Sequence, residues 1–317
     1  MLLYFVRRLF MSLLVALLAI SLLAGLVHFI PGDPVRVILG PRATPAKSAE
    51  VRAEMELDKP IPVQIWNFTR RALSGDLGKD FVSHRPVTAI VGEALPHTLV
   101  LAIGSLTLAA LIGIPLGVYS ATHPNSLADR VSGFIAVGFI TLPSYVAGLF
   151  LLLLFAVQLN WSPAIGAGDW ANPRDYLRHL VLPLVALAVT WVGYLARLVR
   201  ASMLEALTAD YIRTAFAHGL PKRIIYYQHA LKNALIPTVA VLGVGLGNLL
   251  GGAVFVEIIF TRPGLGRLIV DAIASRNYPV VRGGVLAAAL LFVVANLLAD
   301  LVIQWLDPRI QFEEGST

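Results

Sequence analysis

The chain has 317 residues, of which 57% are hydrophobic and 14% charged, and its formal net charge is +6. Soluble domains carry roughly 25% charged residues, so this chain has too little charge to cover a soluble fold of its size. It has no cysteine, which excludes disulfides, thiolate metal sites and cysteine nucleophiles. Its basic residues lie in short groups between apolar runs, unlike a nucleic-acid footprint. The composition indicates a membrane protein.

Six apolar segments are long enough, or nearly long enough, to cross a membrane as helices. About 20 apolar residues are needed, because each helical residue adds about 1.5 Å against roughly 30 Å of hydrocarbon. The fourth segment is the shortest, with 17 residues. We therefore predict an all-α membrane protein with six transmembrane helices, at 9–30, 98–120, 131–159, 180–196, 234–256 and 283–306.

The N-terminus resembles a signal peptide, since Arg7 and Arg8 precede an apolar run. That run has 22 residues, against about 7–15 in a signal h-region, so an uncleaved first helix is predicted. With the N-terminus inside, ten Lys and Arg residues fall in the inner connections and six in the two short outer loops. The positive-inside rule then places both termini in the cytoplasm.

The connection after the first span, 31–96, is too long for a turn and has the composition of a soluble segment. Residues 45–57 and 60–74 are predicted to form two short helices, with Gly75 in the position of a left-handed C-cap. Trp66 offers an apolar anchor. Two roles stay open for this segment: a small cap that covers helix ends, or a docking surface for an external partner.

The inner connection, 197–236, is predicted to be a helix–turn–helix at the cytoplasmic face. Asp210 is the candidate N-cap, 211–218 would form two helical turns, and Gly219 takes the C′ position. Pro221 suits the first turn of a second helix at 222–235, which reaches the start of the fifth span.

Ala215 and Gly219 lie four residues apart on one face of the first of these helices. Two small residues on one face would let the helix approach another surface closely. The segment is also rich in basic residues, so an amphipathic element that rests on anionic lipid is one interpretation. We favour a protein-docking element.

The run from Asp210 to Pro237, DYIRTAFAHGLPKRIIYYQHALKNALIP, resembles the EAA-type cytoplasmic loop of ABC importer permeases. It is most similar to the branch that imports dipeptides, oligopeptides or nickel. The stretches PGDPVRVILG, LDKPIPVQIWNFTRRALSGDLG, RPGLGRLIVDAIASRNYPVV and DLVIQWLDPRI agree, so the resemblance covers nearly the whole chain. It implies a type I ABC importer permease fold with an extracytoplasmic insertion after the first helix, and the first permease subunit of a pair.

The resemblance implies that this loop contains a coupling helix, which inserts into a groove on a cytoplasmic ATPase subunit. The family commonly has Ala-Arg-Ala-Lys-Gly where this chain has Ala-Phe-Ala-His-Gly at 215–219. Either the dock depends more on apolar burial than on ion pairs, or the ATPase has changed to match. The implied coupling residues are Asp210, Tyr211, Ala215, Phe216, His218, Gly219, Ile236 and Pro237.

The chain has no G-x-x-x-x-G-K-[ST] sequence, so we expect that it cannot hold ATP phosphates itself. It has no H-E-x-x-H or G-x-S-x-G sequence, and its seven histidines are scattered without ligand spacing. We therefore expect a transport subunit with no catalytic set, no metal and no cofactor of its own. ATP and magnesium would be bound by partner ATPase subunits.

Three polar residues of the sixth span, Asn296, Asp300 and Gln304, are four apart and share one helical face. Insertion of an Asp at the centre of a membrane helix costs about 3 kcal/mol of free energy, which favours a structural or functional role for these polar residues. It could face the translocation path, or it could be an interhelical hydrogen-bond cluster near the inner interface. Asn248 of the fifth span is a further candidate for the path.

Glycines at four-residue spacing predict close helix packing in two spans. Gly243, Gly247 and Gly251 would form a ridge on the fifth span, and Gly113 and Gly117 repeat the spacing in the second. A dinucleotide-binding role is disfavoured, because these glycines lie in predicted membrane helices and do not follow a strand.

The outer segment and the loop at 261–283 are the regions where an external binding protein would deliver cargo. Glu257 lies near the outer end of the fifth span, where a charge is cheap, so it could gate the path or contact that protein. The candidate contacts are Trp66, Glu257, Arg262 and Arg267.

The predicted organisation has four parts. Residues 1–30 form the N-terminal cytoplasmic end and first transmembrane helix, and 31–96 the extracytoplasmic segment. Residues 97–310 form a five-helix permease core with its coupling loop at 200–236. The remainder is a cytoplasmic tail at 311–317.

The resemblance predicts the permease subunit of an ATP-driven, binding-protein-dependent ABC importer for di- or oligopeptides, in a bacterial inner membrane. Nickel or its chelate, or a glutathione-like solute, is the alternative cargo. An autonomous secondary transporter or channel is the weaker hypothesis, because no internal repeat is evident. The expected partners are a second homologous permease, two P-loop ATPase subunits, an extracytoplasmic solute-binding protein and membrane lipid, with no nucleic acid.

Overall fold

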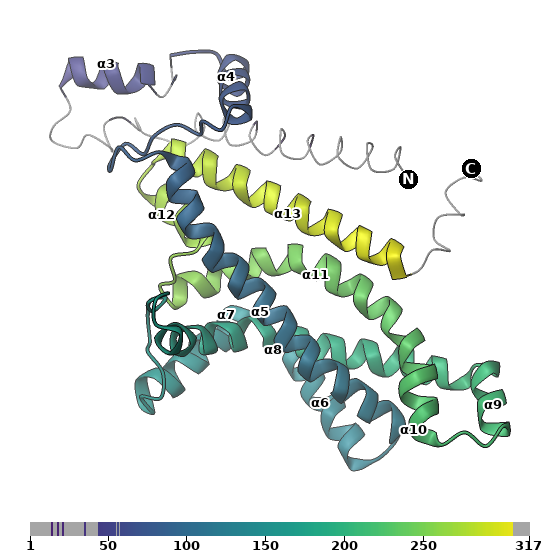
Figure 1. Cartoon of the computed structure of the whole chain (residues 1–317). Coiled ribbons are helices and arrows are strands. Elements are labelled where there is room, and N and C mark those ends of the chain that lie inside the picture. The colour runs from purple at the N-terminus through teal and green to yellow at the C-terminus, as the bar shows by residue number, and fades with distance from the viewer. Residues whose placement is uncertain are drawn as a thin grey trace, which may run out of the picture. The chain divides into compact units, whose positions relative to one another are not determined.

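The computed structural model describes residues 44–54, 56 and 58–306, with isolated positions 14, 18, 21 and 35 (Figure 1). Apart from those isolated positions, the predicted first span at 9–30 lies outside the described residues, as does the tail at 311–317. Within the described residues the chain is helical and has no β-strand, only an isolated bridge between Lys79 and Pro86.

Four helices in the described part of the chain are long and apolar enough to cross a membrane. They are α5 (Val87–Thr122), α8 (Pro173–Thr208), α11 (Leu231–Ile259) and α13 (Tyr278–Leu306). They confirm the second, fourth, fifth and sixth predicted spans. The fourth was expected to be the shortest, yet α8 has 36 residues, because its charged ends continue the helix beyond the apolar stretch.

The third predicted span is not one straight helix. It consists of α6 (Leu127–Thr141), α7 (Ser144–Leu151) and the π-helix η2 (Leu152–Gln158), and the two halves meet at 102°. Pro143 explains the break, because a proline pushes the residue before it out of helical conformation. Leu142 is extended accordingly, with φ −83° and ψ 112°.

The chain divides into two compact units. Unit 1 comprises residues 1–98 and 263–293, and unit 2 comprises 99–262 and 294–317. The helices α5 and α13 each contribute residues to both.

Unit 1 contains the two short helices expected in the outer connection, α3 (Pro45–Glu54) and α4 (Ile61–Leu73), together with α12 (Leu265–Ala274). Gly75 ends α4 with φ +82°, and the amides of Gly75 and Asp76 donate to Ala72 O and Arg71 O. This is a Schellman C-cap, as predicted. The core of the unit is formed by Val87, Val91, Leu265, Ala272, Val280 and Val281.

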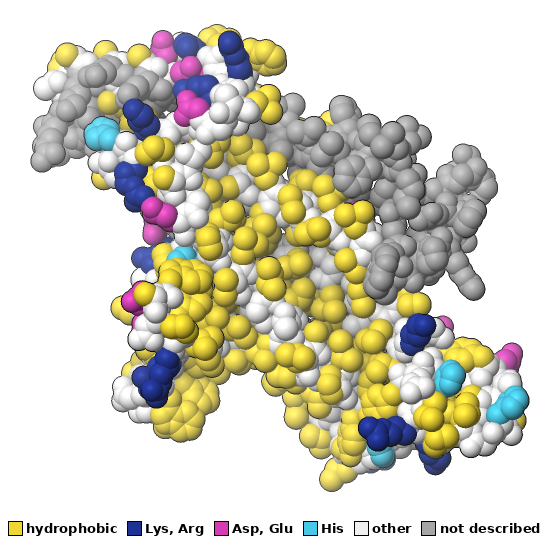
Figure 2. Space-filling model, in the orientation of Figure 1, with side chains coloured by type: hydrophobic (Ala, Val, Ile, Leu, Met, Phe, Trp, Pro, Cys, Tyr) yellow, Lys and Arg dark blue, Asp and Glu magenta, His cyan; other side chains and the backbone are white. Residues whose placement is uncertain are grey.

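Unit 2 is built on α8, which packs against α5, α6, α7 and α11. The predicted close packing at Gly113 and Gly117 is confirmed: a Cβ on Gly117 would lie 2.7 Å from both Ala196 O and Val199 Cβ. Hydrophobic side chains cover much of the outer surface of this unit (Figure 2), including Leu111, Phe134 and Phe150. A membrane or a partner helix would cover such a surface.

The glycine ridge predicted on α11 is only partly correct. A Cβ on Gly243 would lie 2.4 Å from Ala299 Cβ, so α11 and α13 are in close contact there. A Cβ on Gly251, by contrast, would meet no described residue within 4 Å. Another close approach on α11 is at Gly245, against the Trp191 ring. Gly245 lies on a face that the four-residue pattern did not include.

Candidate coupling surface and polar sites

The helix α9 (Asp210–Ala217) follows α8 and ends in a Schellman motif at the predicted C′ residue. Gly219 has φ +73°, its amide donates to Phe216 O, and the Leu220 amide donates to Ala215 O. The predicted N-cap was wrong by one residue. Ala209 is the N-cap, while the Asp210 carboxylate lies in the first turn, 3.5 Å from Arg213 Nη1.

One face of α9 is buried against its own chain. Ile212 is completely buried and Ala215 is 7% exposed. We call this packing the inner cluster, and its residues are Val118, Ala121, Val199, Met203, Ile212, Ala215, Ile225, Ala230 and Ala234. The prediction that Ala215 lets a partner approach closely is therefore wrong, because its small side chain allows α9 to pack onto α5, α8 and α11. The cluster makes α9 a fixed extension of the membrane helices.

Exposed apolar side chains flank the buried face of α9 and continue through the turn after it to residue 227. We call this the coupling surface, and it consists of Tyr211, Phe216, Leu220 and Tyr227, with exposed fractions of 42%, 44%, 36% and 57%. Asn233 Nδ2 holds the Tyr211 hydroxyl at 2.9 Å. Basic side chains and histidines surround the surface over α9 and α10 (Lys222–Ile224) (Figure 2). His218 is exposed and its Nδ1 lies 2.8 Å from Thr214 O.

The second helix of the loop was predicted to end at residue 235, and the structure contradicts that boundary. The short helix α10 continues through the π-helix η3 (Ile225–Ala230) into α11, so residues 222–259 form one continuous rod. Ile236 and Pro237 lie inside α11 and do not mark its start. The wider π-helical turn allows the chain to pass from loop to membrane helix without a break.

An open groove on unit 2 contains the predicted path residue Asn248. The groove has a volume of about 590 Å³, and Asn248 is exposed in it. Its polar groups come from Thr190, Tyr194 and Asn248, and its walls from Ile140, Trp191, Ala240, Val241, Val244 and Gly245. Neither Asn296 nor Asp300 lines this groove, so it does not bring Asn248 together with the polar stripe of α13.

The polar stripe of α13 lies beside a close helix contact. Asn296 and Asp300 are half-buried, and Ala299, between them in the sequence, is the residue that Gly243 of α11 approaches. The side chain of Gln304 lies outside the described residues. The position of Asp300 next to this contact fits either role predicted for it.

Glu257 and Arg262 were expected as external contacts, and both are completely buried within unit 2. The helix α11 ends in a third Schellman motif, with Thr261 at φ +53° and the Arg262 amide donating to Glu257 O at 2.8 Å. This turn directs Arg262 back onto Tyr176, whose hydroxyl accepts from Nη2 at 2.9 Å. Burial lowers the pKa of the Arg262 guanidinium, and the Tyr176 hydroxyl and Glu257 carboxylate oppose that effect.

The other two expected contacts are accessible, both in unit 1. Trp66 of α4 is 69% exposed, on the side of the helix away from the buried Gln64 and Phe68. Arg267 of α12 is half-buried, and its Nε lies 3.3 Å from Asp271 Oδ2. Trp66 is therefore the more exposed of these two candidate contacts.

Among the residues that the structure describes, no three His, Asp or Glu side chains lie close enough to hold a metal ion.

Two family matches together cover nearly the whole chain. Residues 113–312 match the "Binding-protein-dependent transport system inner membrane component" family, and residues 1–102 match the N-terminal family of the same membrane component. The chain belongs to this family of ABC importer permeases. The permease is thus a transport subunit and a multi-pass inner membrane protein.

Curated relatives of the permease align with it from end to end. The "Glutathione transport system permease protein GsiC" of Pectobacterium atrosepticum is 39% identical over 314 residues, covering 99% of this chain and 100% of the relative. Its counterpart in Salmonella choleraesuis is 38% identical over the same shares.

Solved structures agree with the fold of the permease. The inward-facing MetNI methionine ABC transporter matches with a TM-score of 0.57 at 20% identity, over 69% of this chain and 96% of that one. An amino acid ABC transporter with histidines matches with a TM-score of 0.54 at 19% identity, over 70% and 94%. The permease therefore has the fold of type I ABC importer permeases.

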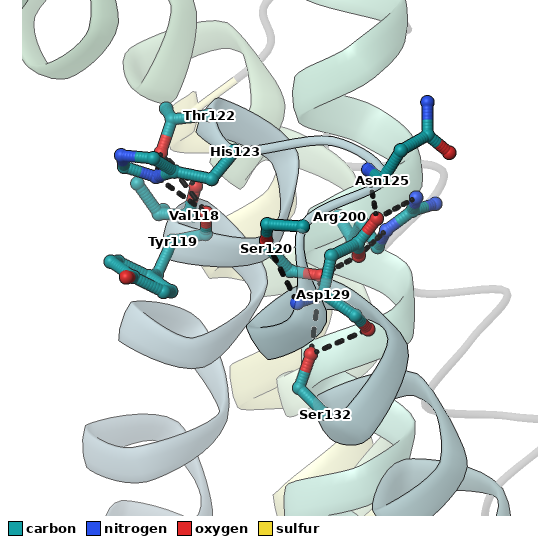
Figure 3. A network of polar contacts seen from close by, with 10 residues as sticks. Val118, Tyr119, Ser120, Thr122, His123, Asn125, Asp129, Ser132 and Arg200 are labelled. Carbon is teal, nitrogen blue, oxygen red and sulfur yellow. Dashed lines mark hydrogen bonds and ion pairs between the residues drawn. The ribbon is translucent and has the colours of Figure 1, made fainter.

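The permease also contains a buried ionic network that sequence reasoning missed (Figure 3). Arg200 of α8 reaches Asp129 of α6 with Nε 2.7 Å from Oδ1 and Nη2 2.9 Å from Oδ2. Ser120 Oγ donates to the same carboxylate, as does the Asn125 amide at 2.9 Å. The Asp129 amide in turn donates to the N-cap Ser126 Oγ, which caps the start of α6.

This network joins the turn between α5 and α6 to the end of α8 that leads into α9. Ser120 and Arg200 are sequence neighbours of Ala121 and Val199 in the inner cluster. The Ser-x-x-Asp pattern at 126–129 was the available sequence signal. It did not reveal that Arg200 is the partner of Asp129, because Arg200 entered the prediction only as one of the ten basic residues used for the positive-inside rule.

Proposed function

We propose that the permease is the first of two permease subunits in an ATP-driven importer that carries glutathione or a similar small peptide. The observation that carries the cargo assignment is the 39% identity, over 99% of the chain, to a glutathione transport permease. This favours the glutathione-like alternative over the di- or oligopeptide cargo that the motifs first suggested. The proposed partners are a homologous permease, an external binding protein and two P-loop ATPases that hold ATP and magnesium.

The coupling surface supports a docked ATPase. Tyr211 and Phe216 on α9 and Leu220 in the turn after it are exposed apolar side chains, although burying one such side chain fully is worth about 1.5–3 kcal/mol. A groove on an ATPase subunit would bury them. Phe216 stands where the family commonly has a cation, so this dock would depend on apolar burial more than on ion pairs.

Transmission into the membrane follows from how α9 is held. The inner cluster packs α9 onto three membrane helices, and the Asp129–Arg200 pair fixes the neighbouring turn between α5 and α6. A displacement of α9 therefore moves these helix ends with it. ATP binding would shift the bundle between two states, because the docked ATPase makes different contacts with each.

The proposed orientation places α9 and both termini in the cytoplasm, as the positive-inside count predicts. The short helices α3 and α4 of unit 1 would then face the binding protein, with Trp66 as an exposed anchor. The groove around Asn248 is the proposed segment of the path in unit 2. Its few polar groups on apolar walls are typical of a site for small solutes.

Purification of the tagged chain from its native host tests the assembly. A second permease and P-loop ATPases should accompany it, and a chain that transports alone would contradict the importer. Cargo is tested on the reconstituted complex by measuring ATP hydrolysis with its binding protein and glutathione, alanyl-alanine or Ni²⁺. Glutathione should stimulate hydrolysis most. Stimulation by alanyl-alanine or Ni²⁺ alone would overturn the cargo and leave the importer in place.

A further inference from the structure

Unit 1 contains a partly open cavity of about 270 Å³ between the end of α4, the turn at 76–84 and the start of α13. Its walls combine aromatic rings with charged groups. The lining residues that matter here are Phe68, Arg71, Asp80, Phe81, Tyr278 and Arg282. We propose that this cavity binds the carboxylate group of a small solute.

Arg282 is the reason for the proposal. Its side chain is 8% exposed, and its Nη2 donates to Gln64 Oε1 at 2.9 Å. Its Nε is buried and has no hydrogen-bond partner among the described residues. A buried charged donor without an acceptor is costly, so the free edge of this guanidinium calls for an acceptor.

The acidic groups nearby do not supply that acceptor: within the described residues, none forms a hydrogen bond or ion pair with Arg282. Asp76 also lines the cavity, and its Oδ1 accepts from the Gly78 amide. Asp80 accepts from the Val82 and Ser83 amides, from Ser83 Oγ and from Asn277 Nδ2. Glu56 attracts Arg282, but its Oε1 accepts from Lys59 and Asn67. Its Oε2 accepts no hydrogen bond from the described residues and is ion-paired with Arg71 Nη2 at 3.5 Å.

A second cation makes the cavity more favourable for an anion. Arg71 also lines the cavity, and its charge repels that of Arg282. An anion between the two guanidinium groups would relieve this repulsion. A carboxylate matches the planar edge of Arg282, which can donate two parallel hydrogen bonds to it. The aromatic walls disfavour a more strongly hydrated dianion such as sulfate.

A carboxylate bound in this cavity would stabilise the packing within unit 1. Gln64 belongs to α4 and Arg282 to α13, so a carboxylate on Arg282 would strengthen the contact between these helices. The inference depends neither on which cargo the importer carries nor on which subunits accompany the chain.

The test measures thermal unfolding of the full chain in lipid nanodiscs, in whatever complex it copurifies with, against sodium acetate and sodium chloride at equal ionic strength. Acetate should raise the unfolding midpoint, because a ligand that binds only the folded state stabilises it. Arg282→Lys keeps the charge but lacks Nε, and should need at least about tenfold more acetate for the same shift. Gln64→Glu would place a carboxylate of the chain itself on Arg282, and should abolish the response.

Arg70→Gln is the matched control, since Arg70 is exposed on α4, the helix that carries Gln64, and does not line the cavity. It should respond to acetate as the wild type does. The proposal is overturned if acetate acts no more strongly than chloride, if Arg282→Lys retains the full response, or if Arg70→Gln loses as much of it. If Gln64→Glu does not fold, Arg282→Lys decides alone.

Discussion

Arg200 binds Asp129 at two points, with Nε 2.7 Å from Oδ1 and Nη2 2.9 Å from Oδ2, across 71 residues of sequence. Asp129 is almost buried, whereas the Arg200 side chain is 36% exposed. The pair connects the turn between α5 and α6 to the end of α8 that leads into α9. The ends of α5 and α8 also contribute to the inner cluster, so the pair fixes the helix ends against which α9 packs.

Replacement of Asp129 should therefore weaken both stability and coupling. Asp129→Asn leaves Arg200 without its bidentate partner, and we expect a loss of about 1–3 kcal/mol, limited by the partial exposure of Arg200. Arg200→Lys should lose less, because it keeps the charge. Thermal unfolding measures the first effect, and the ratio of ATP hydrolysed to solute transported measures the second. Arg197→Gln, at an exposed position on the same helix, should change neither, and equal loss there would refute the assignment.

Phe216 should contribute to ATPase binding with little effect on the fold. Phe216→Ala removes an exposed ring from the coupling surface, and the loss of about 2 kcal/mol of apolar burial should weaken ATPase association roughly tenfold or more. The amount of ATPase that copurifies, and its affinity for the reconstituted permease, measure this effect. Thr214→Ala removes a side chain of similar exposure on the same helix and is the control. Wild-type affinity in Phe216→Ala would exclude an apolar dock at this position.

Some elements of the fold were predictable because short-range rules determine them. Gly75 and Gly219 end their helices as predicted, since a left-handed C′ residue needs only local chain chemistry. Gly219, however, has open space around its Cβ position. Its lack of a side chain serves the backbone turn, and none of the residues that the structure describes approaches it closely. The bend at Pro143 also follows a local rule. It was not predicted, because the apolar run at 131–159 continues across Pro143 and was taken as a single helix.

Other features depend on contacts that no local pattern contains. Glu257 and Arg262 lie at a helix end, where exposure is the default expectation. They are buried because Tyr176, 86 residues away from Arg262, provides the acceptor. The prediction that Ala215 faces a partner failed for the same reason. An eight-residue helix such as α9 carries both small and bulky apolar side chains, and the sequence alone does not show which of them the chain itself buries.

Gly117 should not tolerate even a methyl group. A Cβ there would lie 2.7 Å from the Ala196 carbonyl oxygen and 2.7 Å from Val199 Cβ, and neither atom is the end of a flexible side chain. We expect Gly117→Ala to destabilise unit 2 by about 1–3 kcal/mol through overpacking. Gly133→Ala on α6 is the matched control, because a Cβ there meets nothing within 4 Å. It should be neutral or stabilise by about 0.5–1 kcal/mol through helix propensity. Thermal unfolding of the two variants side by side measures the difference, and equal effects would mean that α5 and α8 are not in close contact at Gly117.

Asp80 should make the stability of unit 1 depend on pH. Burial alone raises the pKa of its carboxyl, but hydrogen bonds from Ser83, Val82 and Asn277 together hold it below the ordinary value of 3.8. A carboxyl whose pKa is lower in the folded state contributes stability that is fully present above the unfolded-state pKa and is lost as pH falls through the folded value. Unfolding measured between pH 6 and about pH 3 should therefore show a decline below about pH 4. Asp80→Asn should be less stable than the wild type at pH 6 and should have a shallower decline. An unchanged slope in Asp80→Asn would show that other carboxyl groups cause the acid loss.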